Sequence, residues 1–293
     1  MGAGNFNRAR GTTRAAALAT LLLCGSATAW AHDSWFAPLP RTDRGEAVFA
    51  FGTGNQFPVQ EVTIPLTQLQ RSGCQGAGQR VAPMRWVADR PVALVLRSAR
   101  PVPATAALTC WAQLHPIPIE IDDATVEVYL NEISALPAVR ERWAALRARG
   151  VRFQEIYTKV ARVEINALEP GAAPAVRGAE TSAGVSAGAP EAVPGLALDL
   201  RVESPLPLRA GDTLRAQLLR DGQPLAGLPL ELRSDLSPLG IWRQTDAEGR
   251  ISVPVPLAAN WLLRGVDLRP AEGRPDAWDS RFITLALEVL PRR

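Results

Sequence analysis

Residues 196–203 read Leu-Ala-Leu-Asp-Leu-Arg-Val-Glu, and this stretch decides the fold of the second half of the chain. Its leucines and valine alternate with small or charged residues, which is the pattern of a β-strand with one buried face. Short apolar runs of the same kind recur down to residues 282–289, and Asp221-Gly222 offers a hairpin turn between two of them. About seven short strands in roughly 98 residues predict an antiparallel, immunoglobulin-like sandwich over residues 196–293.

The residues just before this half have the composition of a linker. Residues 168–195 are rich in Ala, Gly, Pro and Ser and contain no aromatic side chain. Such a segment cannot bury enough apolar surface to order itself. We therefore predict a flexible linker at 168–195, between an N-terminal domain at 32–167 and a C-terminal domain at 196–293.

The N-terminal half has a mixed pattern. A helical hairpin is predicted between residues 122 and 150, because Asp122 or Asp123 can cap a first helix and Pro137 can begin a second. Gly150 is suited to the position just after that second helix. The fold class expected for the whole chain is mainly β, with two β-sandwich-like (immunoglobulin-like) domains, the first carrying a short helical hairpin. The strands predicted in the first half are 46–52, 60–66, 92–98, 105–113 and 159–165.

The first 31 residues have the layout of a secretory signal peptide. Three arginines precede an apolar run at residues 15–24, and Ala29-Trp30-Ala31 has the small-x-small pattern after which signal peptidase cuts. The apolar run is shorter than the about 20 residues that span a bilayer. We therefore predict cleavage after Ala31 and a mature protein in a bacterial periplasm.

Cleavage would also change the charge of the chain. The whole sequence has a formal net charge of +3, and residues 1–31 contain three arginines and no acidic residue. The mature chain would be formally neutral, which disfavours nucleic acid as a partner. No later apolar stretch is suited to a membrane span. Lys159 is the single lysine among the basic residues, and we interpret this as coding bias rather than as a functional signal.

Two cysteines remain after cleavage, Cys74 and Cys110. An even number of cysteines in an oxidising compartment predicts a disulfide between them. Neither has a second cysteine nearby in the sequence, so a CxxC redox pair or a zinc ribbon cannot be built. The pair is therefore assigned a structural role.

Metal binding is the chemistry for which the sequence offers ligands. If cleavage follows Ala31, His32 becomes the amino terminus, and its amine and imidazole Nδ1 can chelate one metal ion in a six-membered ring. Imidazole nitrogen suits copper, nickel and zinc. Asp33 could add a carboxylate ligand, or it could accept a hydrogen bond from one of the groups that bind the metal. The alternative, that cleavage merely happens to fall before a histidine, stays open.

Other candidate residues have both a functional and a structural interpretation. His115 could be a second imidazole ligand, although a lone histidine at a strand end is more often a surface residue. Asp267 could supply an oxygen ligand or belong to a turn. GxSxG, HExxH, Walker and GxGxxG patterns are absent from the sequence, so no catalytic residue is assigned. Four tryptophans could form a binding platform but are more typical of a core: Trp35, Trp111, Trp261 and Trp278.

Several segments, taken in order, resemble one family of bacterial periplasmic proteins, the domain-of-unknown-function family 4198, which is labelled as nickel-uptake associated. The resemblance covers nearly the whole mature chain. No single segment is specific, but the ordered set is. The segments are AHDSWF (31–36), VYLNE (128–132), FQEIYTKV (153–160), GQPL (222–225), TDAEGR (245–250) and WLL (261–263).

The resemblance implies a secreted protein with an immunoglobulin-like or carboxypeptidase-regulatory-like sandwich. It also implies a role in handling nickel or cobalt at the cell envelope, with delivery to a transporter. The family often has a histidine where this chain has Asp267. If that position is a ligand, this chain offers an oxygen there in place of imidazole.

Three functions are considered on these grounds. The first is a periplasmic accessory protein that binds or delivers nickel, cobalt or copper, with an envelope transporter or receptor as its partner. The second is a non-catalytic module that binds proteins or glycans at the envelope. The third is a copper oxygenase, which would need His115 beside His32. The candidate metal ligands are His32, Asp33, His115 and Asp267.

Overall fold

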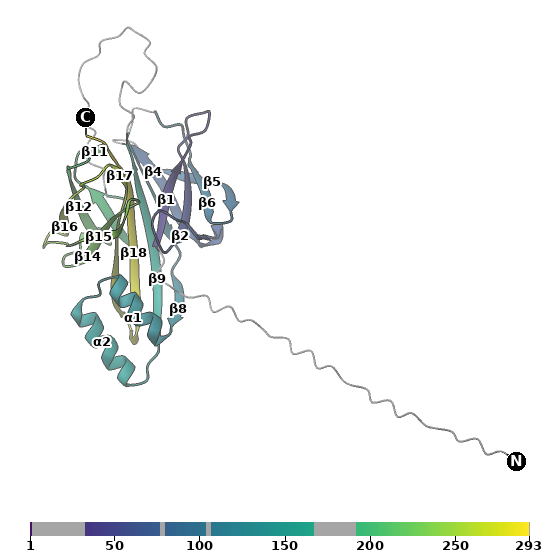
Figure 1. Cartoon of the computed structure of the whole chain (residues 1–293), viewed down its shortest axis with the longest axis vertical. Helices are drawn as coiled ribbons and strands as arrows, with labels where there is room; N and C mark the ends of the chain where they lie inside the picture. Colours follow the sequence, from purple (N-terminus) through teal and green to yellow (C-terminus); the bar gives the residue numbers. More distant parts are fainter. Residues whose placement is uncertain (2–32, 77–79, 104–106, 167–191, 293) are drawn as a thin grey trace, which may run out of the picture.

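The computed structural model describes residues 1, 33–76, 80–103, 107–166 and 192–292 (Figure 1). The described chain is mainly β with a short helical hairpin, which confirms the predicted fold class. The helices lie at one end of the molecule, and the carboxyl end of the chain lies at the other (Figure 1). The predicted signal peptide, His32 and residues 168–191 of the predicted linker lie outside the described residues.

The strands of the first half belong to one large sheet. They follow the order β1-β2-β6-β5-β4-β7-β9, while β3 pairs with β2 and β8 pairs with β9. The bounds are Asp33–Leu39 (β1), Val48–Gly54 (β2), Val62–Thr63 (β3), Leu69–Gly76 (β4), Ala82–Arg90 (β5), Ala93–Ser98 (β6), Leu108–Leu114 (β7), Ile117–Ile121 (β8) and Phe153–Ile165 (β9), with a short 3-10 helix at Leu66–Gln68 (η1).

The second half is a sandwich. Strands β18, β17, β14 and β15 extend the large sheet, and β10, β12, β13 and β16 form a second sheet. Leucines of the predicted strand at 196–203 pack there into the core between the sheets. The bounds are Leu198–Val202 (β10), Leu208–Arg209 (β11), Thr213–Arg220 (β12), Gln223–Pro224 (β13), Pro229–Ser234 (β14), Ser237–Gln244 (β15), Arg250–Pro254 (β16), Ala259–Ala271 (β17) and Arg274–Leu290 (β18).

Strands β9 and β18 join the two halves. They are parallel neighbours, and their register runs from Ala277 opposite Gln154 to Leu287 opposite Glu164 (Figure 1). On its other side β9 pairs antiparallel with β7. The large sheet therefore runs through both of the predicted domains.

The helical hairpin forms where the sequence predicts it. Helix α1 (Asp123–Glu132) begins after Asp122, whose side chain accepts a hydrogen bond from the Thr125 N–H at 3.0 Å. Helix α2 (Pro137–Ala148) begins with its proline, and Gly150 follows it with a φ of 75°. The buried faces of the helices pack around Phe153 and Trp278. Neither helix has the length and apolar character needed to cross a membrane.

The turn that the sequence predicted is present, whereas two strands with exposed side chains were not predicted. Asp221 and Gly222 have φ values of 50° and 79° and connect β12 to β13, as the predicted hairpin turn requires. Strands β5 and β15 were not predicted, because most of their side chains are exposed or half-buried and show no alternation. The strand predicted at 60–66 is only the two residues of β3.

The four tryptophans considered as a binding platform are core residues. All four are at most 5% exposed. They are distributed over three separate apolar clusters, with Trp35 in the first half, Trp278 beside the helices, and the other two in the core of the second half. The core interpretation is therefore correct.

The predicted linker ends earlier than residue 195. Val193 is 5% exposed and belongs to the core of the second half. Its N–H donates a hydrogen bond to Asp199 Oδ2 at 2.8 Å. Composition alone missed this contact, because one valine among small residues leaves no periodic signal.

The predicted disulfide between Cys74 and Cys110 is present. The two residues face one another across the antiparallel pair β4 and β7. The bond therefore fastens two neighbouring strands of the large sheet.

Replacing both cysteines with alanine should destabilise the protein. The two half-cystines are 36 residues apart in the sequence, and the loop-entropy model assigns a cross-link of that span about 4 kcal/mol. We expect C74A/C110A to lose about that much free energy of unfolding in urea at pH 7. Equal midpoints for the variant and the oxidised wild type would contradict the structural role.

Candidate functional site

A cavity of about 400 Å³ lies where β1, β2, β8, α1, β9 and β18 approach one another. We call it the Lys159 cavity. Its titratable side chains all come from α1 and β9. Its lining residues include Ser34, Leu114, Tyr129, Glu155, Tyr157, Lys159 and Phe282.

Strand β9 supplies the charged groups of this cavity. Glu155, Tyr157 and Lys159 are two residues apart, so their side chains leave the same face of the strand. The parallel register places Ser280 opposite Tyr157 and Phe282 opposite Lys159. The pairing of β9 with β18 therefore assembles the site from both halves of the chain.

Glu155 is a buried carboxyl group. It is 4% exposed, and the Ser280 hydroxyl donates a hydrogen bond to its Oε1. Its Oε2 is buried and makes no hydrogen bond of ordinary geometry to the described residues. Burial raises the pKa of Glu155 to about 7, although the hydroxyls of Ser280 and Tyr129 and the charge of Lys159 oppose the rise. The group is therefore partly protonated near neutral pH.

Lys159 places an amine in the same cavity. Its Nζ lies 5.2 Å from the centre of the Tyr157 ring and 5.3 Å from the centre of the Phe282 ring. Burial lowers the pKa of Lys159 to about 8, although the negative charges of Asp33 and Glu155 oppose the change. A carboxyl group and an amine that both titrate near neutrality thus share one cavity, an arrangement typical of functional sites.

Two tyrosines complete the wall. Tyr129 of α1 is 3% exposed, and its ring stacks on Phe282 with centroids 6.2 Å apart. Burial, and after it the charge of Glu155, raises the pKa of both Tyr129 and Tyr157. Both hydroxyls are therefore neutral hydrogen-bonding groups at physiological pH.

The start of β1 is fixed beside the cavity. Asp33 is 5% exposed, and its Oδ2 accepts a hydrogen bond from Arg264 Nη1 at 3.0 Å. The next residue, Ser34, lines the cavity and shares a hydrogen bond of 2.8 Å with the Thr53 hydroxyl. The Thr284 hydroxyl donates to the Ser34 carbonyl at 2.5 Å. Asp33 is thus an anchor of the chain, held in an ion pair.

Of the two histidines, the structure describes His115. His32 lies outside the described residues. His115 is exposed, directly follows Leu114, and donates its N–H to the Gln68 carbonyl at 2.9 Å. Both Leu114 and Gln68 line the Lys159 cavity. His115 itself does not line the cavity, although its neighbour Leu114 does, and Ser34, two residues after His32, lines it as well.

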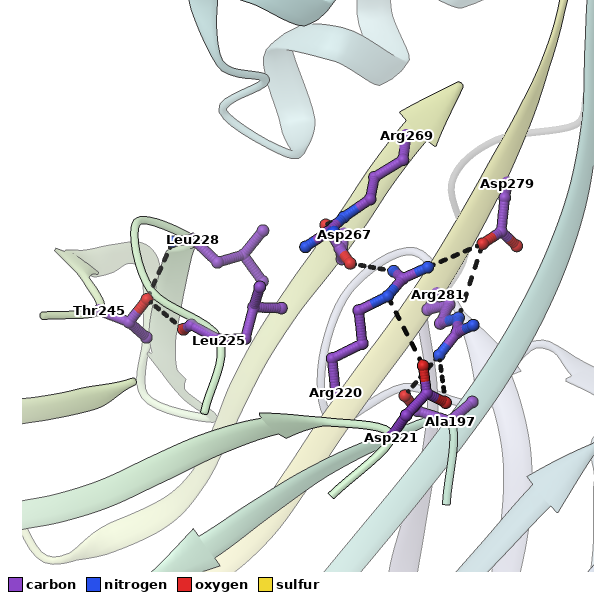
Figure 2. A network of polar contacts seen from close by, with 10 residues as sticks. All are labelled: Ala197, Arg220, Asp221, Leu225, Leu228, Thr245, Asp267, Arg269, Asp279 and Arg281. Atoms are coloured by element: carbon purple, nitrogen blue, oxygen red, sulfur yellow. Dashed lines mark hydrogen bonds and ion pairs between the residues drawn. The ribbon is translucent and has the colours of Figure 1, made fainter. Parts of the chain in front are cut away.

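Asp267 belongs to a different group of charges, which Figure 2 shows. Its Oδ2 accepts from Arg220, and its Oδ1 accepts from Arg269 Nε at 2.9 Å. Arg220 also binds Asp279 at 3.0 Å. Asp267 is 4% exposed, and both of its oxygens are used by guanidinium groups. The structure gives this residue the role of an anchor that ties β12 to β17 and β18.

The described residues do not form a complete metal centre among themselves. No group of three or more His, Cys, Asp or Glu side chains is placed to hold a metal ion in this part of the chain. Asp33, His115 and Asp267 are therefore not gathered at one point.

Glu155 and Lys159 were not predicted from the sequence as site residues. The strand was predicted at 159–165, whereas β9 begins at Phe153. Without those six residues, the alternation of Glu155, Tyr157 and Lys159 on one face was not visible. The lone lysine was a second signal, and we had interpreted it as coding bias.

No protein-family model and no curated protein matches this chain. The resemblance to the periplasmic family therefore remains a prediction. The function proposed below rests on the geometry of the Lys159 cavity.

The raised pKa of Glu155 predicts a pH-dependent stability. Between pH 4.5 and about pH 7 the folded protein keeps a proton on Glu155 that the unfolded chain releases, so rising pH favours unfolding over this interval. Glu155→Gln keeps the side chain neutral and should remove this loss. The quantity to measure in urea is the free energy of unfolding of E155Q minus that of wild type. This difference should be larger at pH 8 than at pH 4 by on the order of 3 kcal/mol.

Lys159 contributes to the pH dependence over a different interval. The pKa of Lys159 is lowered from 10.5 to about 8, so its contribution changes between those two values and in the opposite direction, with stability rising as pH rises. A stability difference between E155Q and wild type that does not change from pH 4 to pH 8 would show that Glu155 titrates normally.

Proposed function

We propose that this protein is a secreted accessory protein of the bacterial periplasm that binds a transition-metal ion, namely nickel, cobalt or copper. The ion would be held by the amine and imidazole of His32 at the mature amino terminus, at the border of the Lys159 cavity. His115 would supply a second imidazole. The bound ion would pass to an envelope transporter or receptor.

One observation carries this proposal. Ser34, two residues after His32, and Leu114, one residue before His115, line the same cavity of about 400 Å³. The two histidines of the chain are 83 positions apart in the sequence, yet the chain next to each borders this one space. Imidazole is a preferred ligand of nickel and copper, and two such groups with a free amine are a suitable donor set.

Anchoring of the first strand supports the proposal. A chain cut after Ala31 carries its new amine on the residue joined to Asp33, and consecutive Cα atoms are about 3.8 Å apart. Asp33 is held by Arg264, and Ser34 is held by Thr53 and Thr284. Ligands attached to a rigid strand lose less conformational entropy when they bind.

The cavity would make metal affinity depend on pH. A protonated Lys159 opposes a bound cation, and an ionised Glu155 attracts one. Because burial brings these pKa values to about 8 and about 7, rising pH removes positive charge and adds negative charge in this range. Affinity should therefore rise with pH, in the same direction as deprotonation of the amine and imidazole themselves.

The decisive comparison is between mature protein that begins at His32 and the same protein with one additional alanine in front of it. The additional residue converts the amine into an amide, which cannot complete the chelate ring. We expect nickel and copper affinity, measured by calorimetric titration at pH 7.5, to fall at least about tenfold. Equal affinity for the two proteins would refute the proposal.

Two further measurements control this comparison. Intact mass of the protein exported with its own leader must show a chain that starts at His32. His115→Gln should weaken binding without abolishing it, because the amine and the first imidazole remain. Equal thermal midpoints for the metal-free variants would exclude unfolding as the cause.

A further inference from the structure

The hairpin of β5 and β6 carries a group of exposed apolar side chains. Trp86 is 52% exposed, Val87 is 45% exposed and Val92, in the turn between the strands, is 40% exposed. Figure 1 places both strands at one margin of the molecule, away from β14 and β15. We call residues 80–92 the hairpin surface. None of these residues lines the Lys159 cavity.

Most of β5 has a neighbouring strand on one side only. Among the residues that the structure describes, β4 pairs with Ala82 and Pro83, and the rest of β5 pairs with β6 alone. The pairing of β5 with β6 shifts between Trp86 and Ala88, so Val87 is the additional residue of a β-bulge. Side chains from both faces of the strand can therefore be reached from its open edge.

The hairpin surface is also basic. It contains Arg80, Arg85 and Arg90, all of them exposed, and a single acidic residue, Asp89. None of the three arginines forms an ion pair with a residue that the structure describes. Asp89 Oδ1 accepts a hydrogen bond from Trp86 Nε1 at 3.1 Å, which orients the indole ring. Positive charge thus flanks an exposed tryptophan.

Arginines and a bulge at an open edge have a second explanation. Both features keep an edge strand from pairing with the strands of other proteins. That explanation accounts for the charges, but an edge that only repels other strands gains nothing from an exposed tryptophan and exposed valines. Tryptophan is enriched where lipid meets water, because its ring is apolar and its N–H is polar. The combination of charge and apolar surface therefore favours a lipid partner.

We propose that the hairpin surface binds the protein to the surface of an anionic lipid bilayer. Trp86, Val87 and Val92 would enter the boundary between headgroups and acyl chains, where they gain apolar burial. The three arginines would bind lipid phosphates through charge-assisted hydrogen bonds. Anionic headgroups attract such a surface over about one Debye length. The proposal does not depend on the proposed metal function, because it uses other residues and another part of the fold.

The test is co-sedimentation of the mature protein with vesicles of phosphatidylglycerol and, separately, of phosphatidylcholine at low ionic strength. We expect binding to the anionic vesicles, binding at least about tenfold weaker to the zwitterionic ones, and release by about 0.5 M salt. The double variant R85Q/R90Q should weaken binding to phosphatidylglycerol about thirtyfold, since each cation near such a surface contributes about fivefold. W86S/V87S should weaken it at least about tenfold, because the apolar burial is lost.

Two matched controls lie in the second half of the chain. R215Q/R243Q removes two exposed arginines of β12 and β15, and W242S removes an exposed tryptophan of β15. Both should bind phosphatidylglycerol vesicles as the wild type does, with thermal midpoints equal to those of the hairpin variants. Absence of binding by the wild type would overturn the proposal, as would equal binding to the two kinds of vesicle or wild-type affinity in either hairpin variant. Loss of binding in either control would show that the surface is placed wrongly.

Discussion

Strand β9 lies between β7 of the first half and β18 of the second and hydrogen bonds to both. This strand makes one sheet of what the sequence presents as two domains. The Lys159 cavity lies beside its first half, with Glu155, Tyr157 and Lys159. A shift of the β9–β18 register by one residue would turn every side chain of β9 to the opposite face. The Lys159 cavity would then lose its charged groups.

Buried ion pairs also join the two halves of the chain. Arg162 of β9 is fully buried and pairs with Glu164 at 2.8 Å and with Asp199 of the second half at 2.6 Å. Arg264 of β17 pairs with Glu231 and with Asp33 of the first half. Hydrophobic contacts are non-directional, whereas each of these guanidinium groups binds two carboxylates in one geometry. Removing one partner of such a pair costs about 3–5 kcal/mol, because the other charge is left buried and unpaired.

The elements that sequence predicted well are those whose signals are local. The Asp221-Gly222 turn, the Asp122 cap and Pro137 at the start of α2 each act through the backbone of their own segment. The alternation in residues 196–203 likewise needs only one buried face. Strands β5 and β15 could not be predicted from local signals, because their side chains are mostly exposed and show no alternation. They are strands because they pair with neighbouring strands. The disulfide was predictable because two cysteines allow one pairing.

The candidate site shows the same division. The sequence by itself determined the residue types on offer: two histidines, one lysine, and a predicted cleavage point beside His32. Only the tertiary structure decided that Ser34 and Leu114 border one cavity, that Glu155 and Lys159 titrate near neutrality, and that Asp267 is held by arginines. The reason is physical. A pKa and a ligand set depend on burial and on partners brought from distant segments, and the β9–β18 pairing brings those segments together.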